Sequence, residues 1–152
     1  MKYLVRALID WPQSVAQHLR WLAPLFARIV VGWEFLWTGW GKLNNLPFVI
    51  ENFAGWNIPH PDLLAPFVAG VEFIGGLCLL LGLFTRIAAA PLVIVMIVAI
   101  RSALWDQVDS AETLLGFEET TYMAVFFWLA VAGPGKASLD YLLQRWNNSA
   151  EI

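Results

Sequence analysis

The stretch V-E-F-I-G-G-L-C-L-L-L-G-L-F-T-R, Val71–Arg86, decides the fold of this chain. It overlaps an apolar run, Leu63–Phe84, in which Glu72 is the one charged residue. A helix rises about 1.5 Å per residue, so about 20 mostly apolar residues cross the hydrocarbon core of a bilayer. The run therefore predicts a membrane-spanning helix with a carboxylate near its middle.

The charge of Glu72 needs compensation at that depth. An ionised carboxylate near the middle of a bilayer is costly unless it is paired, hydrated or protonated. Two interpretations are open: a buried pair or hydrogen bond that only fixes helix register, or a functional site. Gly75, Gly76 and Gly82 in the same stretch indicate that a second backbone approaches this helix closely.

The overall composition excludes an ordinary soluble domain. Of the 152 residues, 59% are hydrophobic and 14% are charged, and the mean hydropathy is +0.64. These values predict one small polytopic membrane domain, with the lipid bilayer as its first partner. A net charge of -3 without a basic cluster excludes nucleic acid as a partner.

The sequence lacks the residue sets of common metal and redox centres, and no metal site is predicted. Cys78 is the only cysteine, which excludes a disulfide, a dithiol or an iron–sulfur site within the chain. His18 and His60 are predicted to lie on opposite sides of the membrane, so they do not form a two-histidine site. No nucleotide-binding or zinc-hydrolase motif is present.

The chain is predicted to cross the membrane four times. The apolar run Tyr122–Ala132 is too short to cross alone, so the fourth helix must start earlier and carry Glu118 and Glu119. The tight turn at Thr85-Arg86 makes the second and third spans antiparallel neighbours. The first three spans are expected at residues 21–41, 63–84 and 87–104.

Three segments are predicted to lie outside the spans. Met1–Arg20 has the pattern of an amphipathic segment on the membrane surface, and Ala137–Trp146 that of a short interfacial helix. Leu43–Asp62 is predicted to be a connecting loop that folds back as a partly ordered lid. The fold class is therefore all-α: a four-transmembrane-helix bundle with N- and C-terminal interfacial helices. Its parts are an N-terminal segment, a membrane domain and a C-terminal tail, at residues 1–20, 21–135 and 136–152.

The charge distribution predicts the orientation. With four spans, the side opposite the N-terminus holds Lys42 and Arg101 among many carboxylates. The other Lys and Arg residues outside the spans share the side of the N-terminus, and the positive-inside rule then places both termini in the cytoplasm. These residues are Lys2, Arg6, Arg20, Arg86, Lys136 and Arg145.

Helical rise places the intramembrane charges at two depths. At the lower level, Arg28 is expected to pair with Glu72. At the upper level, Glu119 is expected to meet Arg101 and Lys42. Groups of this kind face the interior of a bundle or a water-filled pocket, because an unpaired charge in lipid is costly.

The first span also carries another carboxylate and an aromatic stripe. At 100° per residue, Glu34 points away from both Arg28 and Lys42. An aromatic stripe is interpreted either as an interfacial and packing surface or as a ring-stacking ligand site. It consists of Trp33, Trp37 and Trp40.

A quinone fits such a charged intramembrane pocket. Its ring would lie among aromatic side chains such as Trp37, and its carbonyl groups would accept hydrogen bonds from Arg28, Lys42 or Arg101. Glu72 or Glu119 would exchange the proton that accompanies reduction of the ring. No intrinsic cofactor is predicted beyond this bound molecule.

Three stretches of the chain resemble the DoxX family, whose relatives include the small subunit of thiosulfate:quinone oxidoreductase. They are A-R-I-V-V-G-W-E-F-L-W-T-G-W-G-K-L at Ala27–Leu43, V-E-F-I-G-G-L-C-L-L-L-G-L-F-T-R-I-A-A at Val71–Ala89, and G-P-G-K-A-S-L-D at Gly133–Asp140. The resemblance implies a four-helix protein of the bacterial inner membrane that is associated with redox or oxidative-stress systems.

The resemblance extends to individual polar residues of the family. Arg28, Lys42, Glu72 and Arg86 match the polar pattern of the family. Many relatives have His late in the third span where this chain has Arg101, which weakens any transfer of His-based proton or metal chemistry.

Three functions remain open from the sequence. The first is a membrane subunit of an oxidoreductase or other redox system that binds quinone or docks a redox enzyme. The second is a non-catalytic anchor or assembly factor for a protein partner, in which the charges only lock the bundle. The third is a small-molecule transporter, which would ordinarily show internal repeats and broken helices, or would need a homo-oligomer to complete it.

Overall fold

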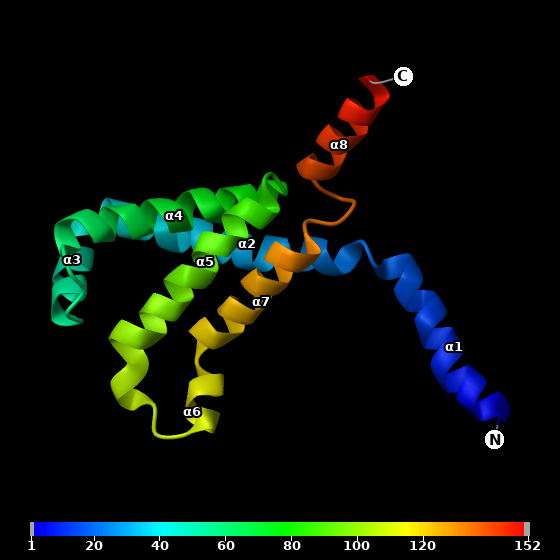
Figure 1. Cartoon of the computed structure of the whole chain (residues 1–152), viewed down its shortest axis with the longest axis horizontal. Helices are drawn as coiled ribbons and strands as arrows, with labels where there is room; N and C mark the ends of the chain where they lie inside the picture. The colour runs from blue at the N-terminus through cyan, green and yellow to red at the C-terminus, as the bar shows by residue number, and fades with distance from the viewer. Residues whose placement is uncertain (1, 151–152) are drawn as a thin grey trace.

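The computed structural model describes residues 2–150, and these residues form eight α-helices and no strand (Figure 1). The all-α prediction is confirmed. A π-helical turn, Ile100–Leu104, and a 3-10 turn, Trp105–Gln107, extend α5. The helices are α1 (Lys2–Leu19), α2 (Leu22–Asn44), α3 (Leu46–Gly55), α4 (Pro61–Leu81), α5 (Thr85–Ala99), α6 (Ala111–Gly116), α7 (Glu118–Ala132) and α8 (Leu139–Ala150).

Among residues 2–150, two helices are long and apolar enough to cross a membrane: Pro61–Leu81, and α5 with its extension, Thr85–Gln107. Helix α2 has 23 residues but carries Arg28, Glu34 and Lys42. Helix α7 has 15 residues and begins at Glu118. The start at Glu118 confirms that both glutamates belong to the last apolar helix, and the four-span topology stays a prediction.

The helices pack as two pairs that share a core. Helix α2 packs mainly on α4, and α5 packs mainly on α7, while α4 and α5 are joined by the short turn Gly82–Phe84 (Figure 1). Phe126 of α7 meets Phe35 of α2 edge to face, with ring centroids 4.7 Å apart. The buried core consists of Val31, Phe35, Leu79, Ala89, Leu92, Met96, Phe126 and Leu129.

Glycine sets the close contact between α2 and α4. A Cβ atom on Gly76 would clash with the backbone nitrogen of Leu36 and would lie 2.8 Å from the carbonyl oxygen of Gly32. A Cβ atom on Gly39 would clash in the same way with Phe73 of α4. The predicted close approach of a second backbone is therefore confirmed, and α2 is the helix that makes it.

The prediction of a loop at Leu43–Asp62 is wrong, because half of this segment is helix α3. Pro47 stands in the first turn of α3, where its missing N–H costs little. Val49 and Phe53 are buried against Ala65 of α4, so the apolar residues of the segment have a packing role. Its folding back onto the other helices is confirmed by this contact.

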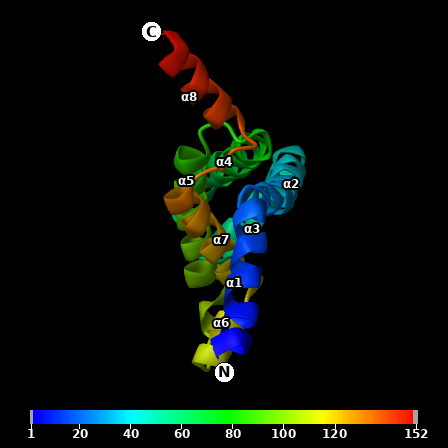
Figure 2. The same ribbon diagram turned by 90° about the vertical axis from the view of Figure 1, so that its right-hand side faces the viewer.

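Helices α1 and α8 lie outside the packed pairs. Both are amphipathic, and α8 points away from the other helices in both views of the chain (Figures 1 and 2). The hydroxyl of Ser138 accepts a hydrogen bond of 3.2 Å from the backbone N–H of Tyr141 at the start of α8. The predicted C-terminal helix is therefore confirmed, beginning two residues later than expected.

Candidate functional site

A buried ion pair joins the middle of α4 to the end of α2. Nζ of Lys42 lies 2.7 Å from Oε1 of Glu72 and donates a hydrogen bond to it. The side chain of Glu72 is 2% exposed, whereas that of Lys42 is 31% exposed. The carboxylate is thus enclosed, and the ammonium group reaches it from a more open position.

The register of α2 against α4 explains this pairing. The two helices run antiparallel, and the glycine contacts set Gly39 beside Phe73 and Gly32 beside Leu80. This register brings the C-terminal end of α2, which carries Lys42, to the level of Glu72. The predicted pairing of Arg28 with Glu72 is wrong, because Arg28 lies near the other end of α2, opposite Gly82.

Glu72 and Lys42 line a cavity of about 620 Å³. Figure 1 shows α4 and α5 diverging from their shared turn. The lining comes from these helices together with α2, α3 and the residues after it, α7, and the turn after α5. The volume lies within the range of small-molecule sites. The walls are mostly apolar, with aromatic rings from Phe35, Phe53, Trp56, Phe67 and Tyr122.

Three more carboxylates line the same cavity: Glu34 on α2, and Glu118 and Glu119 at the start of α7. Lys42 is the one basic side chain among the described residues that line it. The other carboxylate oxygen of Glu72, Oε2, is buried without a hydrogen-bond partner among residues 2–150. A buried acceptor without a partner costs free energy, so a hydrogen-bond donor that reached this oxygen would stabilise it.

A second cavity of about 350 Å³ lies between α2 and α3. It shares Lys42 with the larger cavity, as well as Thr38, Phe53 and Trp56. Lys42 therefore stands in the wall common to both. Asn45 and Asn52 add amide groups to the smaller cavity.

The structure brings three of the six predicted site residues together. Glu72, Lys42 and Glu119 line the larger cavity. Trp37 is 65% exposed and stacks on Trp33, away from it. The other two predicted residues, Arg28 and Arg101, also lie outside the lining.

Arg101 does not join Lys42 and Glu119, so the predicted upper charge cluster is wrong. Its guanidinium group lies 5.1 Å from the ring centroid of Trp105, four residues further along the chain, and forms a cation–π contact with it. The neighbouring residues of the π-helical turn, Ser102 to Leu104, line the cavity instead.

Arg28 is held by backbone carbonyl groups at the opposite end of α2. Its guanidinium donates to Leu79 at the end of α4, at 3.2 Å, and to Ala137 before α8. The side chain is 1% exposed. A Cβ atom on Gly82, which has a φ of +64°, would overlap this guanidinium group. Arg28 therefore ties α2, α4 and the C-terminal segment together.

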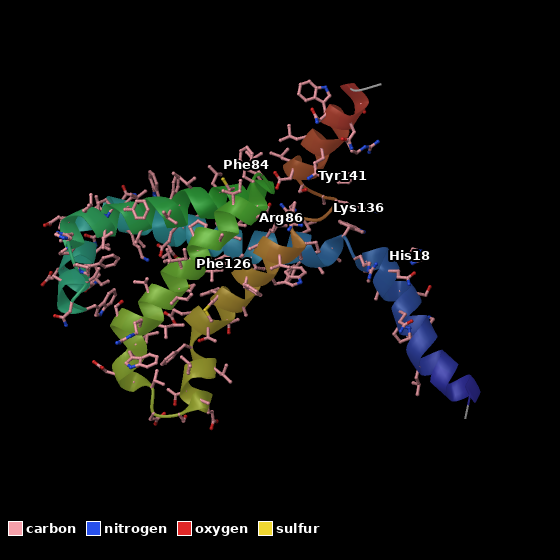
Figure 3. The ribbon with its side chains drawn as sticks, in the orientation of Figure 1. His18, Phe84, Arg86, Phe126, Lys136 and Tyr141 are labelled. Carbon is pink, nitrogen blue, oxygen red and sulfur yellow. The ribbon has the colours of Figure 1, made fainter. Side chains whose placement is uncertain are left out.

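Asp140 and Arg86 complete this junction. The carboxylate of Asp140 accepts hydrogen bonds from the backbone N–H groups of Phe84 and Thr85, at 2.7 and 3.0 Å, and so caps the start of α5. Arg86 donates to the carbonyl oxygen of Val131 at 2.6 Å, near the end of α7. Figure 3 shows Phe84, Arg86, Lys136 and Tyr141 at this same end of the helices. The polar side chains at this junction therefore hold the ends of the helices together.

Several residues that line the larger cavity were not predicted from the sequence, among them Glu34, Tyr122, Phe53 and Trp56. Glu34 was expected to point away from Lys42, but both line the cavity. The signal was present, because Glu34, Thr38 and Lys42 follow one another at intervals of four residues along one helix face. Tyr122 follows Glu118 at the same interval. The contribution of Phe53 and Trp56 required the position of α3.

No metal site is evident in the described part of the chain. Its His, Cys, Asp and Glu residues form no group of three or more that is arranged to hold a metal ion.

Comparison with known proteins gives matches at the level of sequence. The sequence profile of the DoxX family matches residues 23–105. The inner membrane protein YqjF of Escherichia coli K12 is 31% identical over 124 residues, which cover 80% of this chain and 92% of that protein. The inner membrane protein YphA of the same organism is 30% identical over 125 residues, which cover 76% and 86%. No solved structure gives a significant match.

Proposed function

This chain belongs to the DoxX family, and from that premise we propose that it is an inner-membrane protein that binds a small amphipathic ring compound beside the Lys42–Glu72 pair. The observation that carries the proposal is an ion pair enclosed at one wall of a 620 Å³ cavity whose walls are otherwise mostly apolar. A pair that only fixed helix register would not need such a cavity beside it.

Quinone is the ring compound that the sequence suggests, and the volume and the mostly apolar walls of the cavity support it. A bound quinone would supply the capacity to accept electrons and protons. Lys42 has N–H groups beyond the one that it gives to Glu72, and these can donate to a ring carbonyl. The rings of Phe35 and Tyr122 offer apolar and edge-to-face contact. Glu119 lines the same cavity, and in this proposal it is the residue that exchanges the proton accompanying reduction of the ring.

The proposal includes the topology and the role in the cell. The chain crosses the membrane four times through α2, α4, α5 and α7, with both termini in the cytoplasm and α1 and α8 on the membrane surface. It acts as a subunit of a redox or oxidative-stress system, at most as the membrane part of an oxidoreductase.

A second candidate is a membrane anchor without a ligand. Helix α8 favours it, because this helix is amphipathic, points away from the packed pairs, and is tied to them by Arg28 and Asp140. In this case a protein partner would bind to α8, and the cavity would hold lipid.

The test is mass spectrometry of the chain extracted in native-membrane polymer discs. The proposal expects near-stoichiometric quinone with the wild type, its loss in Lys42→Met, and unchanged quinone in Lys136→Met, which removes an exposed lysine far from the cavity. A constant protein partner without quinone would support the anchor. Equal quinone in both variants would overturn the role of the pair.

A further inference from the structure

We infer that the larger cavity selects lipophilic cations: a protonated amine carried on an apolar ring or chain. This inference rests on the proposal that the cavity binds a small amphipathic molecule, and it names the class of that molecule. A hydrogen bond from Lys42 to a ligand carbonyl would suit a neutral ligand, but the other residues that line the cavity favour a positively charged one.

The charge balance of the cavity favours a cation. Four carboxylates line the cavity, from Glu34, Glu72, Glu118 and Glu119, and the described lining offers Lys42 alone against them. Lys42 is already engaged with Oε1 of Glu72. A cationic ligand would offset the remaining negative charge, whereas an anion would add to it.

One carboxylate oxygen of Glu72 lacks a hydrogen-bond donor among the described residues. Oε2 is buried, Glu72 is 2% exposed and lines the cavity, and no donor among the described residues reaches this atom. An ammonium group has three N–H donors and no acceptor, so it supplies what Oε2 lacks. A quinone carries only acceptors at its carbonyl groups and leaves Oε2 without a partner.

The aromatic side chains of the lining favour a cation as well. Faces of aromatic rings attract cations, and a desolvated cation gains more from them than an exposed one does. Phe67 and Trp56 line the cavity on the side of α3 and α4, and Phe35 and Tyr122 line it on the side of α7. Carboxylates and rings together therefore provide both the charge and the apolar contact that a lipophilic amine requires.

The same chemistry has two natural sources. One is a free lipophilic amine, and the other is the ethanolamine headgroup of a membrane lipid. Both carry a primary ammonium group on an apolar body, and binding in discs of different lipid composition separates them.

The experiment compares three ligands that share a naphthylethyl skeleton and differ only in the terminal group, which is an amine, an alcohol or a carboxylic acid. Binding is measured by calorimetry to the full chain in phosphatidylcholine discs, with empty discs subtracted. We expect the amine to bind at least about tenfold more tightly than the alcohol, because a charge pair in a low-dielectric site is strong. The acid is expected to bind more weakly than the alcohol.

Two variants test the carboxylates. Glu72→Gln is expected to weaken binding of the amine by about tenfold and to change binding of the alcohol by less than about twofold. Glu119→Gln repeats the test at a less buried position, in case Glu72→Gln does not fold. Glu51→Gln is the control, because Glu51 is exposed on α3 and outside the lining.

Each outcome is decisive. A preference for the amine that falls in Glu72→Gln or Glu119→Gln supports the inference, and competition by phosphatidylethanolamine in mixed discs assigns the ammonium to lipid. If the alcohol binds as tightly as the amine, the inference fails while the proposed ligand cavity stands. If none of the three ligands and no quinone binds, the proposed function fails as well.

Discussion

The two members of the Lys42–Glu72 pair differ in burial, and this difference determines the effect of removing one of them. Glu72 is enclosed within the packed helices, whereas Lys42 reaches both cavities. Removing the lysine leaves a buried carboxylate without a counter-charge, which is more costly than losing the whole pair. The pair therefore matters for stability through the charge that would remain.

Lys42→Met is expected to lower the free energy of unfolding by about 2–4 kcal/mol, because Glu72 would remain buried and unpaired. Lys42→Met with Glu72→Leu is expected to recover most of this loss, since the pair is then replaced by apolar side chains. The measurement is reversible unfolding in mixed micelles. Lys136→Met is the matched control, and a loss in Lys42→Met no larger than in this control would contradict the buried pair.

At the scale of the helices, the α2–α4 contact determines which polar residues meet. Gly32 and Gly39 on α2, and Gly76 on α4, allow backbone atoms of the two helices to touch. If α2 and α4 both cross the membrane, as the proposed topology has it, no hydrophobic driving force acts between them in lipid, and this close packing is then a main source of their association. The glycine contacts thus set the register that places Lys42 at Glu72 and Arg28 at Gly82.

Gly76→Ala is expected to destabilise the fold by about 1–3 kcal/mol, because its Cβ atom would meet backbone atoms of α2 that cannot move aside without separating the helices. Gly70→Ala on the same helix is the control. A Cβ atom there has no neighbour within 4 Å, so this change is expected to be neutral or stabilising by up to about 1 kcal/mol. Unfolding in mixed micelles measures both, and equal effects would contradict the tight α2–α4 contact.

At the scale of the whole molecule, the two ends of the packed pairs differ. One end gathers Arg28, Arg86 and Asp140, together with the starts of α5 and α8. The other end carries α3, both cavities and the acidic start of α7. The proposed topology places the first end at the cytoplasm, where the positive-inside rule puts basic residues.

This topology predicts the labelling of single cysteines in a Cys78→Ser background. Glu51→Cys on α3 is expected to react with an impermeant maleimide in spheroplasts, which lack an outer membrane. Ser149→Cys on α8 is expected to react only after the inner membrane is disrupted. Both positions are exposed, so burial does not explain a difference between them. Cys78→Ser alone is the unlabelled control, and the reverse pattern would contradict the orientation.

Reasoning from the lengths of the apolar runs was sufficient for much of the architecture. It predicted an all-α chain, the helix around Glu72, a tight turn between this helix and the next, the extension of the last apolar helix to Glu118, and a C-terminal helix. It failed at Leu43–Asp62, where Asn and Pro indicated a loop. Helix α3 forms there because Val49 and Phe53 bury against α4, a contact that local sequence does not show.

The sequence by itself predicted that Glu72 is an intramembrane carboxylate in need of a partner, because the apolar run around it is long enough to cross a bilayer. Only the tertiary structure decided that the partner is Lys42 and that Arg28 binds backbone carbonyl groups. The physical reason is register: it depends on which glycines of α2 and α4 let the two backbones touch, and helical spacing within one segment does not contain that information.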